Sequence, residues 1–538
     1  MSGLPATTSK TKFFAFNGGL DQETPQIALP EGVCYDALNF DCGVLGGYRR
    51  IDGYERFDGR TKPSLVVPTY VGTTQRERAI EKAVAADAQR ALIQAVPGSG
   101  PVRGVVVFKG VAYAFRDNAG GTACVMHKAT VSGWVVVTTP ALLPGGKYHF
   151  ISYNFGGATD TEYLYGCSGA DKAFYFDGTT FTKITTGMTL DAPSYITAHR
   201  NHLFLAFGAS VQHSAIGDPT NWTPVLGASE LAMGDIVTGF SQIPGSEGAD
   251  ALFVATEDSL KILYGTSSTD WKLVTVSEKI GALAGSIQEL GQVFFMAKNG
   301  ITNLQQSSAF GNFAMATFSQ KVERFLSTRY TKVIGSALSM SRNNYRVFFS
   351  DGYAISITFT SQGVSGFMPH YYGKTFNTVW SGKSALGDEI IFASGDDGFV
   401  YELDVGTSFD GSAISSKLNL GYAHFGSPRA LKRYRKAIIE TTGEGYCELY
   451  GRASLGYETR DIYQAVSSGL ASGTSSAFFD VDNWDSFYFD ARPIDPIQIE
   501  LSGTAENMSL QFATNDNYSA AFTLYAATVH YSPRRQLR

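Results

Sequence analysis

The chain has 538 residues, of which 44% are hydrophobic, 13% aromatic and only 17% charged. This composition excludes a disordered chain and predicts two or more folded domains, or one large repeat architecture. A formal net charge of −6 excludes a general attraction to nucleic acid or anionic membranes, because phosphate binding requires an excess of Lys and Arg on the binding face.

The N-terminal stretch, MSGLPATTSKTKFFAFNGGL, lacks the apolar run of a signal peptide. No run approaches the ~18 apolar residues of a membrane helix. We therefore expect a protein that is made and folded in a cytoplasm and has no membrane span. The five cysteines are an odd number, sparsely spread and without a CxxC pair, so neither a disulfide framework nor a zinc site is expected.

A charged and aromatic patch occupies residues 46–59, which read GGYRRIDGYERFDG. Its three arginines are matched by Asp52, Glu55 and Asp58. Arg and Tyr are enriched at protein–protein contacts, because they bury area while keeping specific donors. We therefore predict a self-complementary docking surface rather than a phosphate site. The predicted interface residues here are Tyr48, Arg49, Arg50, Tyr54 and Arg56.

Residues 73–101 are predicted to be a helical insertion, with a helix of about six turns capped by Thr73 or Thr74 and ended by Pro97-Gly98. Apolar residues recur every three or four positions and form one narrow stripe. The stripe consists of Ile80, Val84, Ala88, Ala91 or Leu92, and Ala95. The simpler interpretation is a helix packed on its own domain, and the alternative is a contact with a neighbouring subunit.

Residues 102–405 repeat one pattern, in which an apolar strand, a polar turn and a second apolar strand follow one another. Anchor positions recur at intervals of 40–53 residues, and they are Tyr113, Tyr163, Leu203, Phe253, Phe294, Val347 and Ile391. This interval is typical of β-propeller blades, whose four strands need neighbours on both sides to bury their faces. We predict a mainly β chain with a propeller of six or seven blades. A pair of β-sandwiches is the alternative.

Residues 406–538 are predicted to be β-rich and to form one discontinuous docking domain together with residues 1–72, because the ends of a propeller chain emerge close together. This segment carries the densest positive run of the chain, RALKRYRK. It is either a solvated face or an interface. The predicted interface residues in this run are Arg429, Lys432, Arg433, Arg435 and Lys436.

Known catalytic motifs are missing: the chain has no GxSxG, no HExxH and no GxxxxGK[ST] sequence. The eight histidines are scattered, and the odd separation of His199 and His202 predicts opposite faces of a strand. The segment SGDDGFVY, residues 394–401, loosely resembles the Asp-box turn of sialidase-type propellers, although an Asp-Gly hairpin turn is the simpler interpretation. We predict no catalytic residue, no metal site and no cofactor.

Three segments resemble the tail nozzle, or tail tubular protein B, family of virion proteins from short-tailed bacteriophages. They lie at residues 18–60, 90–130 and 396–440 and contain GGLDQETPQIALPEGVCYDALNF, RALIQAVPGSGPVRGVVVFKG and SSKLNLGYAHFGSPRALKRYRK. The resemblance covers both flanks and most of the repeats. It implies a ring of six subunits, each with a β-propeller, docked below the portal and adaptor rings. The ring would form the distal DNA channel and offer its outside to tail fibres or spikes.

The expected function is therefore a structural one, in a virion tail assembled in the cytoplasm of a bacterial host. Double-stranded DNA would pass through the lumen without sequence recognition and be retained until ejection. We predict that the loop MPHYYGKTFNTVW forms the constriction, with Tyr371, Tyr372 and Phe376 as gate residues. The alternatives are a propeller glycosidase or depolymerase, or a carbohydrate-binding protein, acting on host surface sugars.

Overall fold

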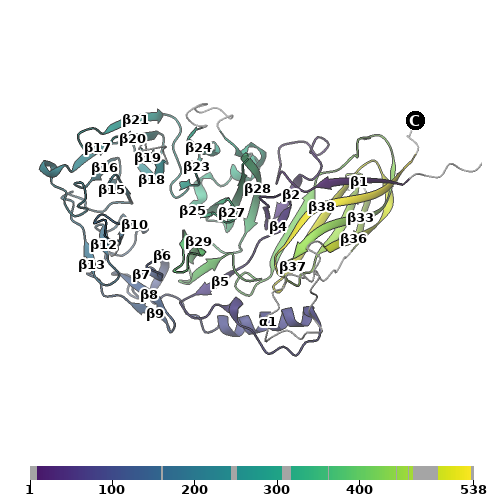
Figure 1. The fold of residues 1–538 in the computed structure, drawn as a ribbon, viewed down its shortest axis with the longest axis horizontal. Coiled ribbons are helices and arrows are strands. Elements are labelled where there is room, and N and C mark those ends of the chain that lie inside the picture. Colours follow the sequence, from purple (N-terminus) through teal and green to yellow (C-terminus); the bar gives the residue numbers. More distant parts are fainter. Residues whose placement is uncertain are drawn as a thin grey trace, which may run out of the picture.

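The computed structural model describes residues 9–158, 161–243, 251–305, 317–361, 363–443, 445–457, 460–464 and 495–534. The chain is mainly β and has two parts that lie side by side, as Figure 1 shows. One part is a ring of small sheets, and the other is a pair of longer sheets near the chain ends. We call them the ring and the flanking sheets.

The described residues of the ring form seven antiparallel sheets, six with four strands and one with three. The first three sheets are β6 (Ser99–Phe108), β7 (Val111–Asp117), β8 (Cys124–Thr130) and β9 (Gly133–Val136); β10 (His149–Tyr153), β11 (Tyr163–Cys167), β12 (Phe174–Phe176) and β13 (Phe181–Lys183); and β14 (Tyr195–His199), β15 (His202–Phe207), β16 (Ser210–His213) and β17 (Ser229–Ala232). The next two are β18 (Val237–Ile243), β19 (Ala251–Thr256), β20 (Leu260–Tyr264) and β21 (Lys272–Ser277); and β22 (Gln288–Glu289), β23 (Val293–Ala297) and β24 (Gly300–Asn303). The last two are β25 (Val333–Ser339), β26 (Asn344–Phe349), β27 (Tyr353–Thr360) and β28 (Gly363–Tyr371); and β29 (Phe376–Lys383), β30 (Glu389–Gly395), β31 (Val400–Leu403) and β5 (Tyr54–Phe57).

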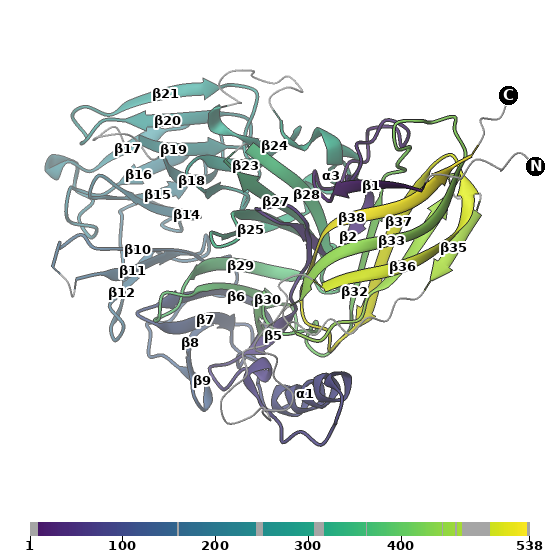
Figure 2. The same cartoon turned by 45° about the vertical axis from the view of Figure 1, so that its right-hand side comes forward.

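The first strand of each sheet packs against the first strand of the next, from β6 through β10, β14, β18, β22 and β25 to β29 and back to β6. The sheets therefore close into a circle around these strands (Figures 1 and 2). The prediction of a mainly β chain with four-stranded, propeller-like repeats is confirmed.

The closing sheet takes one strand from outside the predicted 102–405 range. β5 pairs with β31, with Phe57 opposite Val400 and Tyr54 opposite Leu403. An unpaired outer strand would leave a row of free N–H and C=O groups, and pairing it with a strand from near the N-terminus covers that edge. The two ends of the ring are thus tied together by residues 343 to 349 positions apart in the chain.

Two-residue hairpins connect many of the ring strands. Lys109 and Gly110, with φ of 47° and 77°, turn β6 into β7, and Arg200 and Asn201, with φ of 47° and 62°, turn β14 into β15. Positive φ at both central residues gives the turn the same twist as the strands it connects. Short apolar strands joined by such turns explain the repeat visible in the sequence.

The flanking sheets combine strands from both ends of the chain. One contains β1 (Lys10–Ala15), β3 (Phe40–Cys42), β4 (Tyr48–Arg50), β33 (Lys432–Gly443), β36 (Asp495–Ala505) and β38 (Phe522–Pro533). The other contains β2 (Cys34–Leu38), β32 (Ile414–Leu420), β34 (Tyr450–Leu455), β35 (Arg460–Gln464) and β37 (Met508–Asp516). The N-terminal strands β1 and β4 pair with the C-terminal strand β38, so neither end folds as a sheet alone.

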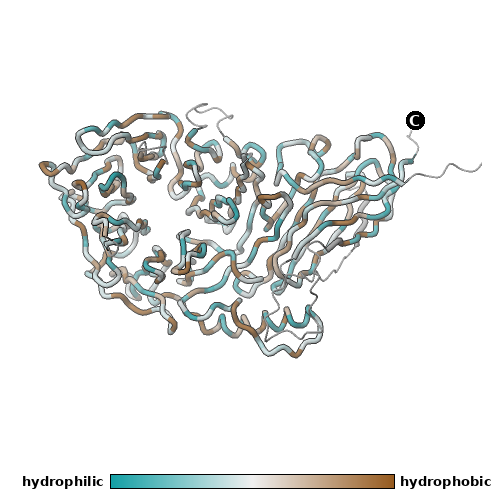
Figure 3. The backbone as a smooth tube through the Cα atoms, viewed as in Figure 1, coloured by the Kyte–Doolittle hydropathy of each residue, from teal (hydrophilic) through white to brown (hydrophobic). Residues whose placement is uncertain are grey.

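The largest hydrophobic core lies between the flanking sheets and extends into the ring sheets that contain β23 and β26. Phe16 stacks on Tyr48 and contacts Phe512, while Phe294 and Tyr345 join the same core from the ring. Brown apolar and teal polar stretches alternate along the strands of both parts (Figure 3). The ring and the flanking sheets therefore share apolar burial as well as a chain connection.

Helix α1 (Gln75–Arg90) is shorter than the predicted helix, although Thr74 caps it as predicted, with a reciprocal bond from Glu77. The chain leaves the helix early because Ile93 and Val96 are buried and the Val96 N–H donates to the Gly398 carbonyl. The other helical segments are short: α3 (Glu323–Leu326), η1 (Pro63–Leu65), η2 (Pro224–Leu226), η4 (Ser319–Val322) and η5 (Tyr330–Lys332). Within the described residues, no helix has the length and apolarity to cross a membrane.

The predicted apolar stripe of α1 does not face the protein. Ala86 and Arg90 are its buried residues, whereas Val84 and Leu92 are exposed. Ion pairs fix the inner side, because Arg90 binds Asp410 at 3.1 Å and Arg76 binds Glu448 at 2.6 Å. Polar contacts therefore hold α1 on its own chain and leave much of its apolar side open to solvent.

Candidate functional site: a charged junction and a basic surface

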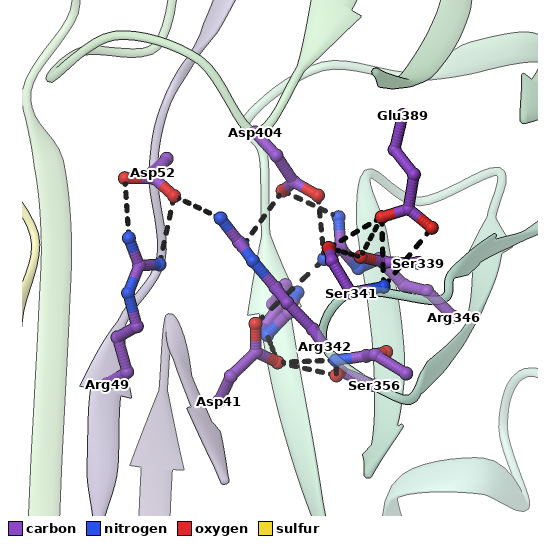
Figure 4. A network of polar contacts seen from close by, with 12 residues as sticks. Asp41, Arg49, Asp52, Ser339, Ser341, Arg342, Arg346, Ser356, Glu389 and Asp404 are labelled. Carbon is purple, nitrogen blue, oxygen red and sulfur yellow. Dashed lines mark hydrogen bonds and ion pairs between the residues drawn. The ribbon is translucent and has the colours of Figure 1, made fainter. Parts of the chain in front are cut away.

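A network of buried and half-buried charges lies where the ring meets the flanking sheets (Figure 4). Asp41 of β3 and Arg49 of β4 come from the flanking side, and Arg346 of β26 and Asp404 from the ring. Asp52, two residues before β5, lies between the two groups and binds Arg342 of the ring at 2.6 Å. The network thus connects the two parts of the molecule by ion pairs.

Asp41 is surrounded by donors of the ring. Its carboxylate lies 3.1 Å from His370 Nε2, and it accepts hydrogen bonds from Ser356 at 2.5 Å and Asn344 at 3.2 Å. Burial by itself would raise the pKa of this carboxyl, but attraction to His370 and Arg346 outweighs it and holds the pKa well below its usual 3.8. Asp41 is therefore a permanent anion.

Arg346 is the matching cation, with its side chain only 2% exposed. It binds Asp404 with both terminal nitrogens, at 3.0 and 3.2 Å, and donates to the Tyr372 hydroxyl at 3.0 Å. Burial lowers the pKa of Arg346, but the charge of Asp404 outweighs that effect and raises it above its ordinary value. This two-point geometry is the strongest form of an Arg–carboxylate contact.

The remaining members extend the chain of contacts to the flanking sheet. Asp52 accepts from Arg49 at 2.9 and 3.2 Å and from Arg342 at 2.6 Å, and Arg342 lies 3.7 Å from Asp404. The three arginines balance the three aspartates in charge. Because each carboxylate is already bound to arginine, the arrangement suits a rigid joint better than proton transfer.

The patch at residues 46–59 supplies part of this joint, and its predicted role as a docking surface for other subunits is wrong for Tyr48, Arg50 and Tyr54. Tyr48 and Arg50 have no exposed surface, and Tyr54 is almost fully buried. Arg50 donates to the Ser519 carbonyl at 2.8 Å, and the Tyr54 hydroxyl donates to the Tyr372 carbonyl at 3.2 Å. A second subunit cannot reach these groups.

Arg49 and Arg56 keep some exposure, but both are bound within the chain. Arg49 pairs with Asp52, and Arg56 pairs with Asp410 at 2.8 Å while its guanidinium lies 4.4 Å from the centre of the Phe399 ring. The equal numbers of acidic and basic residues in the patch were the signal for internal pairing. The docking surface predicted there is thus an interface between two parts of one chain.

The basic run at residues 429–436 divides into buried and exposed members. Lys432 is 2% exposed, and its ammonium donates to the carbonyls of Ser427, Ala430 and Glu506 at 2.7, 3.0 and 2.7 Å. It therefore has a structural role rather than a place on an interface. Arg429, Arg433 and Arg435 are exposed and Lys436 is half-buried, as a surface that meets a partner requires.

Strand pairing brings further basic groups to this end of the flanking sheet. Lys10 lies opposite Tyr531, and Lys436 lies opposite His530, near the end of β38. The exposed Arg534 follows that strand. We call the group Lys10, Arg429, Arg433, Arg435, Lys436 and Arg534 the basic surface. It concentrates positive charge on one end of a chain whose net charge is negative.

The predicted gate residues lie at the passage from β28 to β29: Tyr371 ends β28, Tyr372 follows it in the connection, and Phe376 begins β29. Tyr372 and Phe376 are each 2% exposed and belong to the core that also holds Tyr54, so their assignment as gate residues is wrong. They are buried because β5 closes the ring against this connection. Tyr371 alone of the three is exposed, at 41%.

Two histidines differ from the sequence prediction. His199 and His202 flank a two-residue hairpin and lie opposite each other, so both rings approach Trp271, with centroids 6.1 and 5.6 Å away. The prediction of opposite faces is wrong because the odd separation of His199 and His202 spans a turn rather than a strand.

Residues 394–401 form the hairpin between β30 and β31, with Gly398 at φ 82°. Across the described residues, no group of three or more His, Cys, Asp or Glu side chains could hold a metal ion.

Comparison with known proteins gave no matching family model and no matching curated protein. Solved structures with a similar fold include BBS1N in complex with ARL6DN, at 10% identity over 58% of this chain and 95% of that chain, with a TM-score of 0.38. The RRP9 WD40 repeats match at 12% identity over 58% and 97%, also with a TM-score of 0.38. An exo-beta-1,3-galactanase from Phanerochaete chrysosporium matches at 8% identity over 81% and 96%, with a TM-score of 0.26. At such low scores, these likenesses carry no conclusion about activity or partners.

Proposed function

We propose that the protein is a structural subunit of a short phage tail: a homohexameric nozzle below the portal and adaptor rings, built on a seven-bladed β-propeller. The nozzle would form the distal DNA channel, retain DNA until ejection and carry tail fibres or spikes on its outside. The resemblance in sequence and two exposed surfaces of the molecule support this role. It assigns no catalytic residue.

Seven blades are supported by the circle of seven sheets and by the way it closes. β5 supplies the outer strand of the last sheet, and a ring closed by pairing of distant chain segments resists opening better than one closed by packing alone. The buried ion pairs around Asp41 and Arg346 would hold this ring at a fixed orientation to the flanking sheets. A conduit under the pressure of packaged DNA needs such stiffness.

The observation that carries the proposal is an exposed aliphatic surface around α1 and β9. Val84 and Leu92 are 62% and 59% exposed, and Val131 and Val136 are 87% and 60% exposed. The two groups are neighbours, because Arg60 donates to the Leu92 carbonyl at 2.8 Å and to the Ser132 carbonyl at 2.6 Å. Gathered apolar side chains of this kind mark an interaction site in a soluble protein.

We assign this aliphatic surface to the next copy of the same chain. A closed ring needs a heterologous interface, in which one face of a subunit meets a different face of its neighbour. The basic surface lies at the far end of the flanking sheets and is free for the adaptor ring. The net charge of −6 per chain favours walls along which DNA slides without tight binding.

The test is the mass and symmetry of the purified protein, measured by light scattering and negative-stain imaging, alone and mixed with its adaptor ring. We expect sixfold rings in at least one sample. Introducing charge by Val84→Glu and Val136→Glu should abolish them, because the substituted carboxylates would be buried without partners.

Val225→Glu is the matched control, since Val225 is 92% exposed and lies on η2, away from α1 and β9. It should leave the rings intact. A protein that stays monomeric even with the adaptor contradicts the proposed function. Rings that survive Val84→Glu and Val136→Glu contradict the assignment of the aliphatic surface.

A further inference from the structure

A cavity of about 410 Å³ opens within the basic surface, between strands β33 and β36. Its lining consists of Arg433, Tyr434, Arg435, Leu501, Ser502 and Gly503. Two arginines, a tyrosine and a serine thus border one small hollow. We propose that this cavity binds carboxylate groups of an acidic segment of a partner protein. This inference rests on the proposed function in one respect, namely that a partner docks at this end of the molecule.

The cavity lies where the pairing of β33 shifts on both sides at Arg435, with the extra residue on β36 on one side and on β33 itself on the side of β38. On the β36 side, the pairing passes from Tyr434 opposite Gly503 directly to Lys436 opposite Glu500, so Arg435 faces two unpaired residues, Leu501 and Ser502. On the other side, β38 also has no residue paired with Arg435. A bulge of this kind interrupts the ladder and redirects side chains. Both Arg433 and Arg435 are exposed, while Tyr434 between them is buried.

Neither arginine has an acidic partner among the described residues. Glu500, the nearest carboxylate in the pairing, accepts a hydrogen bond from Gln498, whose own oxygen accepts from Lys436 at 3.3 Å. Two neighbouring guanidinium groups without an anion repel each other. A carboxylate placed between them would remove this repulsion and accept paired N–H bonds in the fork geometry that arginine favours.

The charge of the rest of the molecule selects the kind of anion. A chain with a net charge of −6 repels long polyanions such as duplex DNA or an anionic membrane, whose fields extend far beyond one cavity. A short acidic segment experiences mainly the local field of Arg433, Arg435 and the rest of the basic surface. The cavity volume is also within the range of sites that receive a few side-chain groups.

The test measures binding of a hexaglutamate peptide and, separately, of inorganic phosphate to the full chain by isothermal titration calorimetry. The binding variant is Arg433→Gln with Arg435→Gln. The matched control is Lys128→Gln with Lys272→Gln, which removes the same charge from exposed positions on the ring strands β8 and β21. All four side chains are exposed, so thermal melting should show wild-type folding in both variants.

We expect the affinity for hexaglutamate to fall at least about tenfold in the binding variant and to stay unchanged in the control. Equal affinities in all three proteins would overturn the inference. Phosphate binding that depends on the two arginines, without hexaglutamate binding, would also overturn it and assign the cavity to phosphate.

The inference and the proposed function can fail separately. A monomeric protein that binds hexaglutamate through Arg433 and Arg435 would refute the nozzle and leave the site. Sixfold rings together with an unchanged peptide affinity in the binding variant would support the nozzle and refute the site.

Discussion

Lys147 carries an ammonium group into the ring. It donates to the carbonyl of Ile334 in β25, although β10, the strand that follows Lys147, has β6 and β14 as its neighbours in the circle. The contact therefore crosses the ring. Burial lowers the pKa of Lys147 to about 8 from its ordinary 10.5. Folding thus disfavours the charged form of Lys147. It costs stability at every pH at which the lysine is charged in the unfolded chain.

We predict that Lys147→Met stabilises the protein by about 1–3 kcal/mol at pH 7, after a reduction for partial exposure and for the lost hydrogen bond. Because the folded-state pKa is depressed, the penalty of the wild type is complete below pH 8 and vanishes as the pH rises through 10.5. Urea unfolding from pH 7 to 10.5 should show the advantage of the variant shrinking. Lys128→Met, at an exposed position, is the control. A variant less stable than wild type at pH 7 would contradict the argument.

At the scale of elements, a cluster of aromatic rings joins the β14–β17 sheet to the β18–β21 sheet. His213 Nε2 accepts from the Trp271 indole N–H at 3.0 Å and lies 2.6 Å from the Ser229 hydroxyl, and its Nδ1 lies 3.0 Å from the Ser214 carbonyl. These contacts fit a neutral ring protonated at Nδ1. Protonation of Nε2 would break the contact with Trp271, because both groups would then be donors, and would weaken the packing of the two sheets.

We therefore predict that stability falls as the pH drops below 6.5. Burial lowers the pKa values of His202 and His213 in the folded state, and it lowers that of His127 to about 4. The unfolded chain binds these protons near pH 6.5, so the stabilisation is complete above 6.5 and is lost toward pH 4. His127 alone accounts for about 3 kcal/mol of that loss.

Melting temperatures measured between pH 7.5 and 4.5 provide the check. His213→Gln should flatten this dependence, whereas His530→Gln, a substitution outside the ring, is the matched control. An unchanged slope in the His213 variant would show that the ring histidines do not govern acid stability.

At the scale of the whole molecule, the charged junction determines whether ring and flanking sheets behave as one body. We predict that Asp41→Asn destabilises the protein by about 3 kcal/mol, because it leaves Arg346 and His370 buried beside a neutral group. The folded-state pKa of Asp41 is depressed, so its contribution is present above pH 3.8 and is lost only as the pH falls below that value.

Denaturant unfolding at pH 7 measures this loss, and hydrogen exchange should rise in β3 and β28, on the two sides of the junction. Asp388→Asn, at an exposed position of the β29–β30 connection, is the control and should change neither quantity. Stability equal to wild type in the Asp41 variant would mean that apolar packing alone holds the two parts together.

The sequence by itself determined the features that depend on near neighbours along the chain. Alternating apolar residues with Gly and Asn turns predicted the repeated strands of residues 102–405, and a cap at Thr73 or Thr74 predicted the start of α1, where Thr74 is the cap. The run at 429–436 predicted basic side chains on the surface, and Arg433 and Arg435 are exposed, while their place on an interface stays a prediction. These signals are local, because a turn, a cap or an exposed strand face is set within a few residues.

Tertiary structure alone decided which distant segments meet. Residues 46–59 have the composition of a surface patch, yet Tyr48, Arg50 and Tyr54 are buried because β4 joins β38 and β5 completes the last ring sheet. Tyr372 and Phe376 lose their exposure to the same closure. Local periodicity does not indicate partners that lie hundreds of residues apart in the chain. Whether a side chain is buried there depends on which distant strand pairs with its own strand, and not on its neighbours in the sequence.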